Sequence, residues 1–347
     1  METRDLLIEV GTEELPPKSL NSLSSAFESL IITALAAENL SHGSSQRFAT
    51  PRRLAVLVKQ VAEKQINKEV FRVGPAVTAA YDSDGKATAA ALGFSKSCGV
   101  DLEKLTTTKK NGVEKLAYRT SEKGQKASAL IPGIIGSALR NLPAPKRMRW
   151  GSSREEFVRP LHWCLLLFGQ EQLDLKIFGV SSKSQTRGHR FHNNTEILID
   201  KPSNYEKTLL ETGKVIPDYE NRKENIRAQV LEQGNLANAL TIVDEELLEE
   251  VTSLVEYPIA LTGEFDPAFL EVPSEALILT MKAHQKCFHM TDKNGVLLPK
   301  FVTVSNIRSK DTSQVIKGNE RVIRPRMADA KFFFETDKQT ALETRLE

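Results

Sequence analysis

Hydrophobic residues in the first 62 positions change from a continuous run to helical spacing and back to runs. The run over residues 6–10 predicts a short buried strand. Two more strands are predicted over 47–49 and 52–61, because apolar runs there are interrupted only at Pro51. Between these strands a helix is predicted over residues 17–39, with one apolar side formed by Leu20, Leu23, Phe27, Leu30, Ile31 and Ala34.

The rest of the chain mixes short strands and helices. Turn signals at 82–85 and 110–112 interrupt residues 63–150, with helices predicted near 87–97 and 126–141. A β-rich stretch follows over 158–199, and helices dominate 202–255. Strands near 257–262 and 296–305 alternate with helices near 274–284 and 325–345. We place the start of the last helix at Pro325, because proline is favoured in a first helical turn.

No regular alternation of strand, helix and strand is present, so the pattern predicts an α+β, multidomain fold with mixed or antiparallel sheets and packed helices. The last ten residues have helix-forming composition without a stop signal, which predicts a helical region that continues beyond residue 347. The predicted domains are an N-terminal α+β segment (1–62), a small α/β module (63–150), an α+β domain with a β-rich start and an acidic helical part (151–320), and the start of that helical region (321–347).

Composition places the chain among soluble multidomain proteins. It has 347 residues, 40% hydrophobic and 27% charged, which is enough for two or three ordinary cores. Cys98, Cys164 and Cys287 are far apart and odd in number, which argues against a disulfide framework and for the cytoplasm. The charged start does not resemble a signal peptide, and no apolar run approaches the roughly 18–20 residues of a membrane span. We therefore expect no membrane partner.

The nearly balanced total of 47 Lys/Arg and 45 Asp/Glu hides a regional sorting of charge. Residues 140–190 hold ten basic and four acidic residues, 205–280 hold five and sixteen, and 281–331 hold eleven and four. An acidic region between two basic ones could face a polyanion on one side and another protein on the other. Solvated faces of acidic helices are the simpler explanation of the middle region.

Two adjacent arginines, Arg52 and Arg53, open an apolar strand. Side chains alternate along a strand, so at least one guanidinium should lie close to the core and need a carboxylate. The candidate structural partners are in the neighbouring predicted strand and turn, at Glu9, Glu13 and Glu14. An anion site formed by the other arginine is the alternative.

Arginines stand beside aromatic residues at several separated points, which is a pattern that can hold phosphates and stack on bases. Arg324 and Arg326 oppose the dipole of a helix that would start at Pro325, which favours an anion held between them, although Asp329 is a simpler partner. Trp150 could instead anchor a loop into the core. The candidates for contacting RNA phosphates are Lys146, Arg147, Arg149, Trp150, Arg159, Arg187, Arg190, Arg324 and Arg326.

Known catalytic motifs are missing from the sequence. It contains no phosphate-binding loop, no dinucleotide fingerprint, no serine elbow and no zinc-protease motif, so we assign no catalytic residue. We also predict no metal site: His189 and His192 should point to opposite faces of a strand, and His284, Cys287 and His289 lack a completing pair. The residues favour a binding or assembly role.

Six motifs taken together closely resemble the beta subunit of the bacterial heterotetrameric glycyl-tRNA synthetase, in the same order over all 347 residues. Each motif alone is weak, but six in register are specific. They are Ile8-Glu9-Val10-Gly11-Thr12-Glu13-Glu14-Leu15-Pro16-Pro17, Ala49-Thr50-Pro51-Arg52-Arg53-Leu54, Met148-Arg149-Trp150-Gly151, Phe157-Val158-Arg159-Pro160, Arg187-Gly188-His189-Arg190-Phe191 and Arg324-Pro325-Arg326-Met327-Ala328-Asp329-Ala330.

The resemblance implies a subunit of a glycine–tRNA ligase with two alpha and two beta chains. In that family the alpha subunit uses ATP and Mg²⁺ to form glycyl-adenylate, so no cofactor is expected on this chain. The beta subunit binds tRNA(Gly) and supports assembly, and it continues into a helical HD-type domain and an anticodon-binding domain expected beyond residue 347. The alternatives are a purely structural scaffold that docks the alpha subunit, and a hydrolytic module resembling an editing domain.

Overall fold

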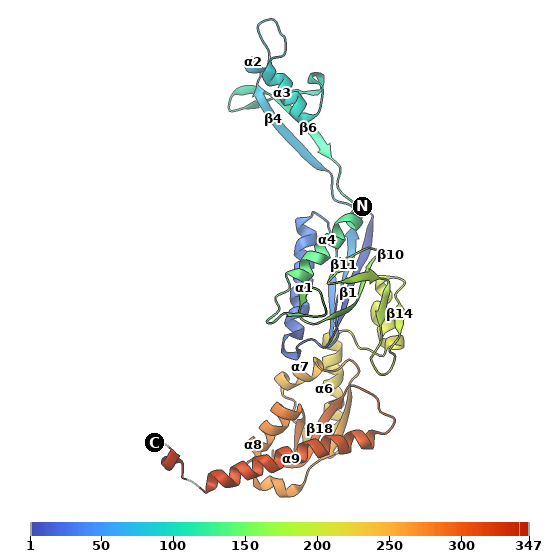
Figure 1. Ribbon diagram of the computed structural model, residues 1–347, viewed down its shortest axis with the longest axis vertical. Helices are drawn as coiled ribbons and strands as arrows, with labels where there is room; N and C mark the ends of the chain where they lie inside the picture. The colour runs from blue at the N-terminus through green and yellow to red at the C-terminus, as the bar shows by residue number, and fades with distance from the viewer. Residues whose placement is uncertain (1, 340, 346–347) are drawn as a thin grey trace.

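The computed structural model describes residues 2–339 and 341–345 and has an elongated shape. Figure 1 shows three bodies along the long axis: a small module around β4 and β6 at one end, a middle domain around β1, and a lower domain around β18 and α9. The sheets are antiparallel or mixed and helices pack on them. The predicted α+β multidomain class is confirmed.

The middle domain is built on one mixed sheet with β1 (Thr3–Thr12) at its centre. β1 pairs antiparallel with both β3 (Arg53–Ala62) and β9 (Leu161–Phe168). β2 (Ser45–Thr50) extends one side of the sheet, and β10 (Glu171–Gln172), β11 (Lys176–Ile177) and β12 (Val180–Lys183) extend the other. Because helices and loops cover both faces, β1 is buried from Leu6 onward, which explains why its sequence is a continuous run.

One face of this sheet is covered by α1 (Leu20–Ala37) and α4 (Ala127–Arg140), which share a core with Leu6, Ile8 and Val10 of β1. The opposite face packs against α5 (Tyr205–Thr208) through Leu7, Phe48 and Tyr205. Residues 127–142 therefore share the core of residues 6–62, although we grouped them with the preceding module from sequence. The remaining short strands of this domain are β7 (Met148–Arg149), β8 (Glu156–Phe157), β13 (Gln185–Arg187) and β14 (Glu196–Leu198).

The helical segment Pro17–Ala37 is the only one in the described part of the chain that is long and apolar enough to cross a membrane. Its apolar stripe, formed by Leu20, Leu23, Phe27, Ile31 and Leu35, is buried against the sheet. Core helices pass the same test of length and composition. We therefore interpret this helix as part of the core.

The small module forms its own antiparallel sheet in the order β4-β6-β5, from β4 (Lys68–Ala76), β6 (Val113–Glu122) and β5 (Thr106–Lys110). Helices α2 (Val77–Ala80) and α3 (Ala89–Cys98) cover one face. Two connecting segments, 63–67 and 123–126, join it to the middle domain as a narrow stem (Figure 1).

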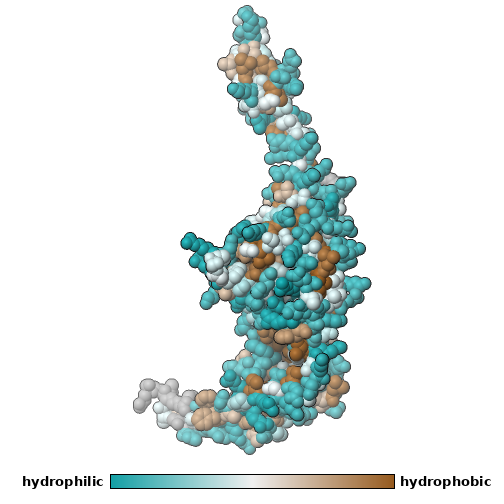
Figure 2. All heavy atoms as spheres, turned by 45° about the vertical axis from the view of Figure 1, so that its right-hand side comes forward, coloured by the Kyte–Doolittle hydropathy of each residue, from teal (hydrophilic) through white to brown (hydrophobic). Residues whose placement is uncertain are grey.

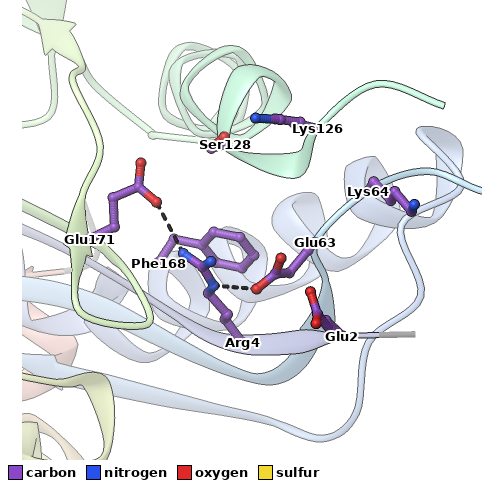
Figure 3. A pocket seen from close by; sticks show the side chains of 8 residues that line it. All are labelled: Glu2, Arg4, Glu63, Lys64, Lys126, Ser128, Phe168 and Glu171. Atoms are coloured by element: carbon purple, nitrogen blue, oxygen red, sulfur yellow. Dashed lines mark hydrogen bonds and ion pairs between the residues drawn. The ribbon is translucent and has the colours of Figure 1, made fainter. Parts of the chain in front are cut away.

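A cleft of about 630 Å³ lies at the base of this stem, where β1, α4 and both connections meet (Figure 3). Arg4 holds Glu63 on one connection and Glu171 on the sheet, the latter at 3.1 Å. The Gln65 amide donates to the Gln125 carbonyl at 3.0 Å. The stem is thus fixed at its root by charged and backbone contacts.

The lower domain is a four-stranded antiparallel sheet in the order β15-β17-β18-β16 with helices on both faces. Its strands are β15 (Leu240–Thr241), β16 (Ile259–Glu264), β17 (Phe288–Thr291) and β18 (Leu297–Ser305). α6 (Tyr219–Leu236) and α7 (Glu245–Thr252) pack on one face. α8 (Ser274–Leu279) and α9 (Thr312–Lys338) pack on the other. Single turns of other helix types lie at Pro17–Ser19, Leu102–Lys104, Pro202–Asn204, Leu209–Gly213, Pro267–Glu271, Thr280–His284 and Leu342–Arg345.

The predicted start of the last helix at Pro325 is wrong. α9 begins at Thr312, where the Asp311 carboxylate accepts from the Ser313 amide at 3.0 Å, and Pro325 lies inside it. An interior proline removes one helical hydrogen bond and strains the preceding turn. Ile323 and Met327, on either side of it, are buried against the sheet. Tertiary packing therefore holds the helix through a residue that local preference would place at its start.

Acid should weaken the pairing of α6 with α7. Arg227 hydrogen-bonds Glu245 at 2.5 Å and lowers the pKa of that carboxyl from 4.5 to about 2. A lowered folded-state pKa contributes stability that is present above pH 4.5 and lost as the pH falls toward 2. We expect Glu245→Gln to lower the thermal midpoint at pH 7 and to show a smaller further drop than wild type between these pH values. Circular dichroism melts at several pH values measure both effects. As a control, Glu232→Gln changes an exposed residue of α6 and should leave the pH dependence of the thermal midpoint unchanged.

Candidate functional site

Four of the six sequence motifs meet at the end of the middle sheet that faces the lower domain. The β1–β3 register places Gly11 opposite Arg53, and the β1–β9 register places Gly11 opposite Trp163. With no side chain at Gly11, the Trp163 indole lies directly over the backbone, where an added Cβ would come within 1.9 Å of the ring. We call the side chains gathered there the Trp163 cluster: Glu9, Glu13, Arg52, Arg53, His162, Trp163, Thr186, Arg187, Arg190 and Glu256.

Arg53 is the buried centre of this cluster. Its guanidinium lies 3.6 Å from Glu9 and 3.3 Å from Glu256, and all three side chains are buried. It also donates to the Thr186 hydroxyl at 3.2 Å and to the Arg187 carbonyl at 3.0 Å. Burial opposes both charges, yet the two carboxylates raise the pKa of Arg53, and Arg53 keeps the pKa of Glu256 below its usual value. The charged pair is therefore the stable form.

The second carboxylate, Glu9, is satisfied from two more sides. The Thr186 hydroxyl donates to it at 2.7 Å, and the Trp163 indole N–H also donates to it. Glu256 in turn accepts from the Thr50 hydroxyl at 2.6 Å. Since Glu256 follows the helices of the lower domain in sequence, this network fastens the lower domain to the middle sheet. A buried charge network with all members hydrogen-bonded fixes one arrangement of its elements.

An outer shell of charges surrounds the buried pair. Arg190 contacts Glu13 at 3.0 Å and Glu14 at 3.6 Å, and His162 contacts Glu13 at 2.8 Å. Burial alone would raise the pKa of Glu13. The His162 hydrogen bond and the charge of nearby Arg52 outweigh this effect, so the pKa of Glu13 is lowered overall. Arg187 pairs with Glu196 at 3.5 Å. Arg159 donates to the backbone carbonyl of Glu14 at 2.9 Å.

Arg52 is the least satisfied member of the cluster. It is half-buried and its Nε atom has no hydrogen-bond partner in the described chain. Burial and the neighbouring Arg190 lower its pKa. Its guanidinium carbon lies 5.8 Å from the Trp163 ring, as does that of Arg187, with Arg53 at 5.7 Å. Three guanidinium groups thus surround one indole.

The predicted basic segment at 146–150 has local structural roles. Arg147 donates to the carbonyls of Arg140 and Leu142, at 2.7 and 2.8 Å, and so satisfies the end of α4. Arg149 pairs with Glu156 at 2.5 Å across the β7–β8 ladder. Trp150 packs against the middle core with its ring 6.4 Å from Phe178. Lys146 is exposed and has no ion-pair partner among the residues described.

The two arginines near the end lie on the lower domain. Arg326 is 3.9 Å from Asp329, and Arg324 has no acid within ion-pair distance in the described ranges. The predicted anion site between them rested on a helix start at Pro325, and that basis is removed because α9 starts at Thr312. Arg324 instead continues an exposed row on α9 with Lys317 and Arg321, spaced by four and three residues. Sequence reasoning missed Lys317 and Arg321, and their spacing becomes visible only once the helix start is known.

The candidate phosphate contacts are therefore not gathered on one face. Arg159, Arg187 and Arg190 surround the buried Arg53, together with Glu9, Glu13, Glu14 and Arg52. Lys146, Arg147, Arg149 and Trp150 lie around the end of α4 and the β7–β8 hairpin. Arg324 and Arg326 are on α9 of the lower domain.

His189 and His192 do not point to opposite faces of a strand, contrary to our prediction from sequence. Residues 188–192 form a turn, and the rings of His189 and His192 lie 4.7 Å apart. His189 is buried, accepts from the Phe191 amide at 3.2 Å and contacts Asn306 at 3.2 Å. These contacts occupy both of its ring nitrogens. Among the described residues no group of three or more His, Cys, Asp or Glu side chains could hold a metal ion.

Two of the three cysteines, Cys164 and Cys287, are poorly placed for nucleophilic catalysis. All three are free, and burial raises the pKa of Cys164 and of Cys287 to about 12. Thiols with such pKa values are protonated at neutral pH and are weak nucleophiles. What the described site shows directly is a set of charged and aromatic side chains held in fixed positions.

Comparison with known proteins identifies close relatives. A family model described as glycyl-tRNA synthetase beta subunit matches residues 6–347. Proteins named glycine–tRNA ligase beta subunit share 50% identity in Hahella chejuensis and 47% in both Marinobacter nauticus and Coxiella burnetii, each over 100% of this chain. The chain spans 50% of the length of these relatives.

Proposed function

Because the chain belongs to the glycyl-tRNA synthetase beta-subunit family, we propose that it is part of a glycine–tRNA ligase that attaches glycine to tRNA(Gly) using ATP. Within that enzyme it is a non-catalytic part that binds tRNA and supports assembly. ATP and Mg²⁺ are used by an alpha subunit, and two alpha and two beta chains form the cytoplasmic enzyme. The family match over residues 6–347 supports the proposal.

The exposed basic row on α9 carries the tRNA-binding part of the proposal. Lys317, Arg321 and Arg324 are exposed on one side of the helix and have no acid within ion-pair distance in the part of the chain that is described. Cations without a carboxylate partner are free to neutralise RNA phosphates, which releases the counterions condensed on the RNA. Arg187, Arg190 and Arg159, in contrast, already have carboxylate or carbonyl partners.

A purely structural scaffold is the second candidate function, and the Trp163 cluster favours it. Arg53 and Glu256 join the middle and lower domains, and buried Arg222 of α6 donates to the Ala49 carbonyl at 2.6 Å across the same junction. Beside this junction Phe191 is 71% exposed. A rigid junction with an exposed aromatic residue suits docking of another subunit. The hydrolytic editing alternative has no support from the described residues.

Neutralising the basic row should flatten the salt dependence of tRNA binding. We expect the triple variant Lys317→Gln, Arg321→Gln and Arg324→Gln to lower the slope of log affinity against log salt by about three, since each lost phosphate contact removes about one. Filter binding of tRNA(Gly) to the complex of full-length beta with alpha, at several salt concentrations, measures the slope.

The matched control removes the same charge from paired lysines. Lys282, Lys286 and Lys331 each contact acids within 3.3 Å, so their change to Gln should leave the slope close to wild type. Equal slopes for both triple variants would remove α9 from the binding surface. Normal assembly with alpha and no tRNA affinity in the wild-type complex would favour the scaffold function.

A further inference from the structure

The three-stranded sheet of the projecting module packs its helices on one face and leaves much of the other exposed, with Ala117 as a buried residue of that second face. Arg72 of β4 donates to the Ser97 carbonyl at the end of α3, and Gly74 lies against the Phe94 ring of the same helix. These contacts place α3 on the face formed by Arg72, Gly74 and Leu116. Residues one position along each strand therefore point away from the helices.

The strand register identifies the residues of this open face. Phe71 of β4 lies opposite Arg119 of β6, and Thr108 of β5 lies opposite Lys115. Lys110 pairs with Val113 two residues further along the same two strands. Directly paired residues share a face, so an aromatic ring and three cations lie along one face, with Lys115 four residues and Val113 six residues along β6 from Arg119.

The side chains of this face are available for a ligand. Phe71 is 48% exposed although it is a large aromatic residue. The Arg119 guanidinium lies over its ring, 5.6 Å from the centroid. In the described chain, no acid lies within ion-pair distance of Lys110, Lys115 or Arg119, and the one acidic residue on this face is Glu69 at its edge. This differs from the Trp163 cluster, where carboxylates compete for the arginines.

We propose that this open face binds unpaired nucleotides of an RNA, with a base stacked on Phe71 and Arg119 and the backbone held by Lys110 and Lys115. The inference rests on the proposed function, since it assumes that the subunit contacts tRNA. An aromatic ring beside cations on a sheet is how single-stranded nucleic acid is bound, because every base has a face that can stack. A base-paired helix hides those faces, so duplex regions fit less well.

The module is also placed to reach such nucleotides. Its narrow stem carries the sheet away from the middle domain (Figure 1). Figure 2 shows apolar surface on this distant module, which lies far from the two larger cores. On this module Phe71 presents an exposed aromatic ring beside the Arg119 guanidinium.

The test uses the complex of full-length beta with alpha and tRNA(Gly) as the probe. Phe71→Leu and Arg119→Gln should each raise the dissociation constant in filter binding by about fivefold or more. Fivefold corresponds to the lower end of the free energy lost with one stacked base. Chemical probing of the bound tRNA should show that a few unpaired bases protected by wild type become reactive in both variants.

Two control variants change the opposite side of the same module. Leu92→Ala removes an apolar side chain that is 53% exposed on α3, and Lys104→Gln removes an exposed cation. Both should bind tRNA like wild type. Melting curves of all four variants check that the module is folded, and Arg119→Gln keeps the test valid if Phe71→Leu melts early.

The outcomes separate this inference from the proposed function. Unchanged affinity and protection in both open-face variants, with weaker binding by the α9 triple variant, would overturn the inference alone. If wild type binds no tRNA, the tRNA-binding proposal fails and the inference fails with it. If the open-face variants bind tRNA normally but no longer copurify with alpha, the face holds a protein partner and the inference is overturned.

Discussion

Replacing Arg53 with methionine should lower the free energy of unfolding by about 3–5 kcal/mol, the range for removing one partner of a buried ion pair. The loss leaves Glu9 and Glu256 buried without their shared cation, while Thr50, Thr186 and Trp163 can only partly compensate. Methionine fills a similar volume, so the effect reports the charge more than a cavity. Urea unfolding of the wild-type and variant chains, followed by circular dichroism, measures the difference.

A surface pair provides the control for this prediction. Arg149→Met breaks a short contact with Glu156, but both side chains are largely exposed, so we expect a loss below about 1 kcal/mol. Similar losses at the two positions would show that the buried network is not a major source of stability. A loss at Arg53 confined to the lower domain would instead show that the network mainly joins the domains.

The Arg53 effect should also depend on pH, with a definite sign. In wild type the pKa of Glu256 is lowered, so its contribution is present above the ordinary value of 4.5 and lost as the pH falls. In the variant, burial without the guanidinium should raise the pKa of this carboxyl, which then takes up a proton more readily. The difference in stability between wild type and variant should therefore shrink as the pH falls from 7 to 4.

Hydrophobic patterns were sufficient to predict elements that bury one side or both sides in a core formed by nearby segments of the chain. The apolar run and the helical stripe in the first 62 residues predicted β1, α1 and β3, because each buries a face that the pattern shows directly. The expectation that one of Arg52 and Arg53 lies in the core followed from alternation alone, and the structure places Arg53 there beside Glu9.

The rest depends on contacts that the sequence does not display. Glu256 is 203 positions from Arg53, and no local signal connects them. The start of α9 was misplaced because a proline is favoured at a first turn, whereas burial of Ile323 and Met327 holds the helix through it. Phe71 and Arg119 become neighbours only through the β4–β6 register, so the open face could not be predicted from charge counts.

Gly11→Ala should be among the most destabilising single substitutions in the chain. The new Cβ would lie 1.9–2.2 Å from three indole atoms of Trp163, far inside contact distance. The ring must leave its place, which breaks its hydrogen bond to Glu9 and its packing against Arg53. Displacing a buried tryptophan costs about 3–5 kcal/mol, which exceeds the usual cost of added methyl groups. Urea unfolding measures the loss.

The same substitution elsewhere should have the opposite sign. Gly93 lies exposed inside α3 with no atom within 4 Å of its would-be Cβ, so Gly93→Ala should stabilise the module by roughly 0.5–1 kcal/mol through helix preference.

The steric argument for Gly11 also predicts coupling between Gly11 and Trp163. If the indole is what the new methyl meets, the cost of Gly11→Ala should be much smaller in a Trp163→Leu background than in wild type. Equal costs in the two backgrounds would show that Gly11 is required for its backbone conformation and not for its approach to Trp163.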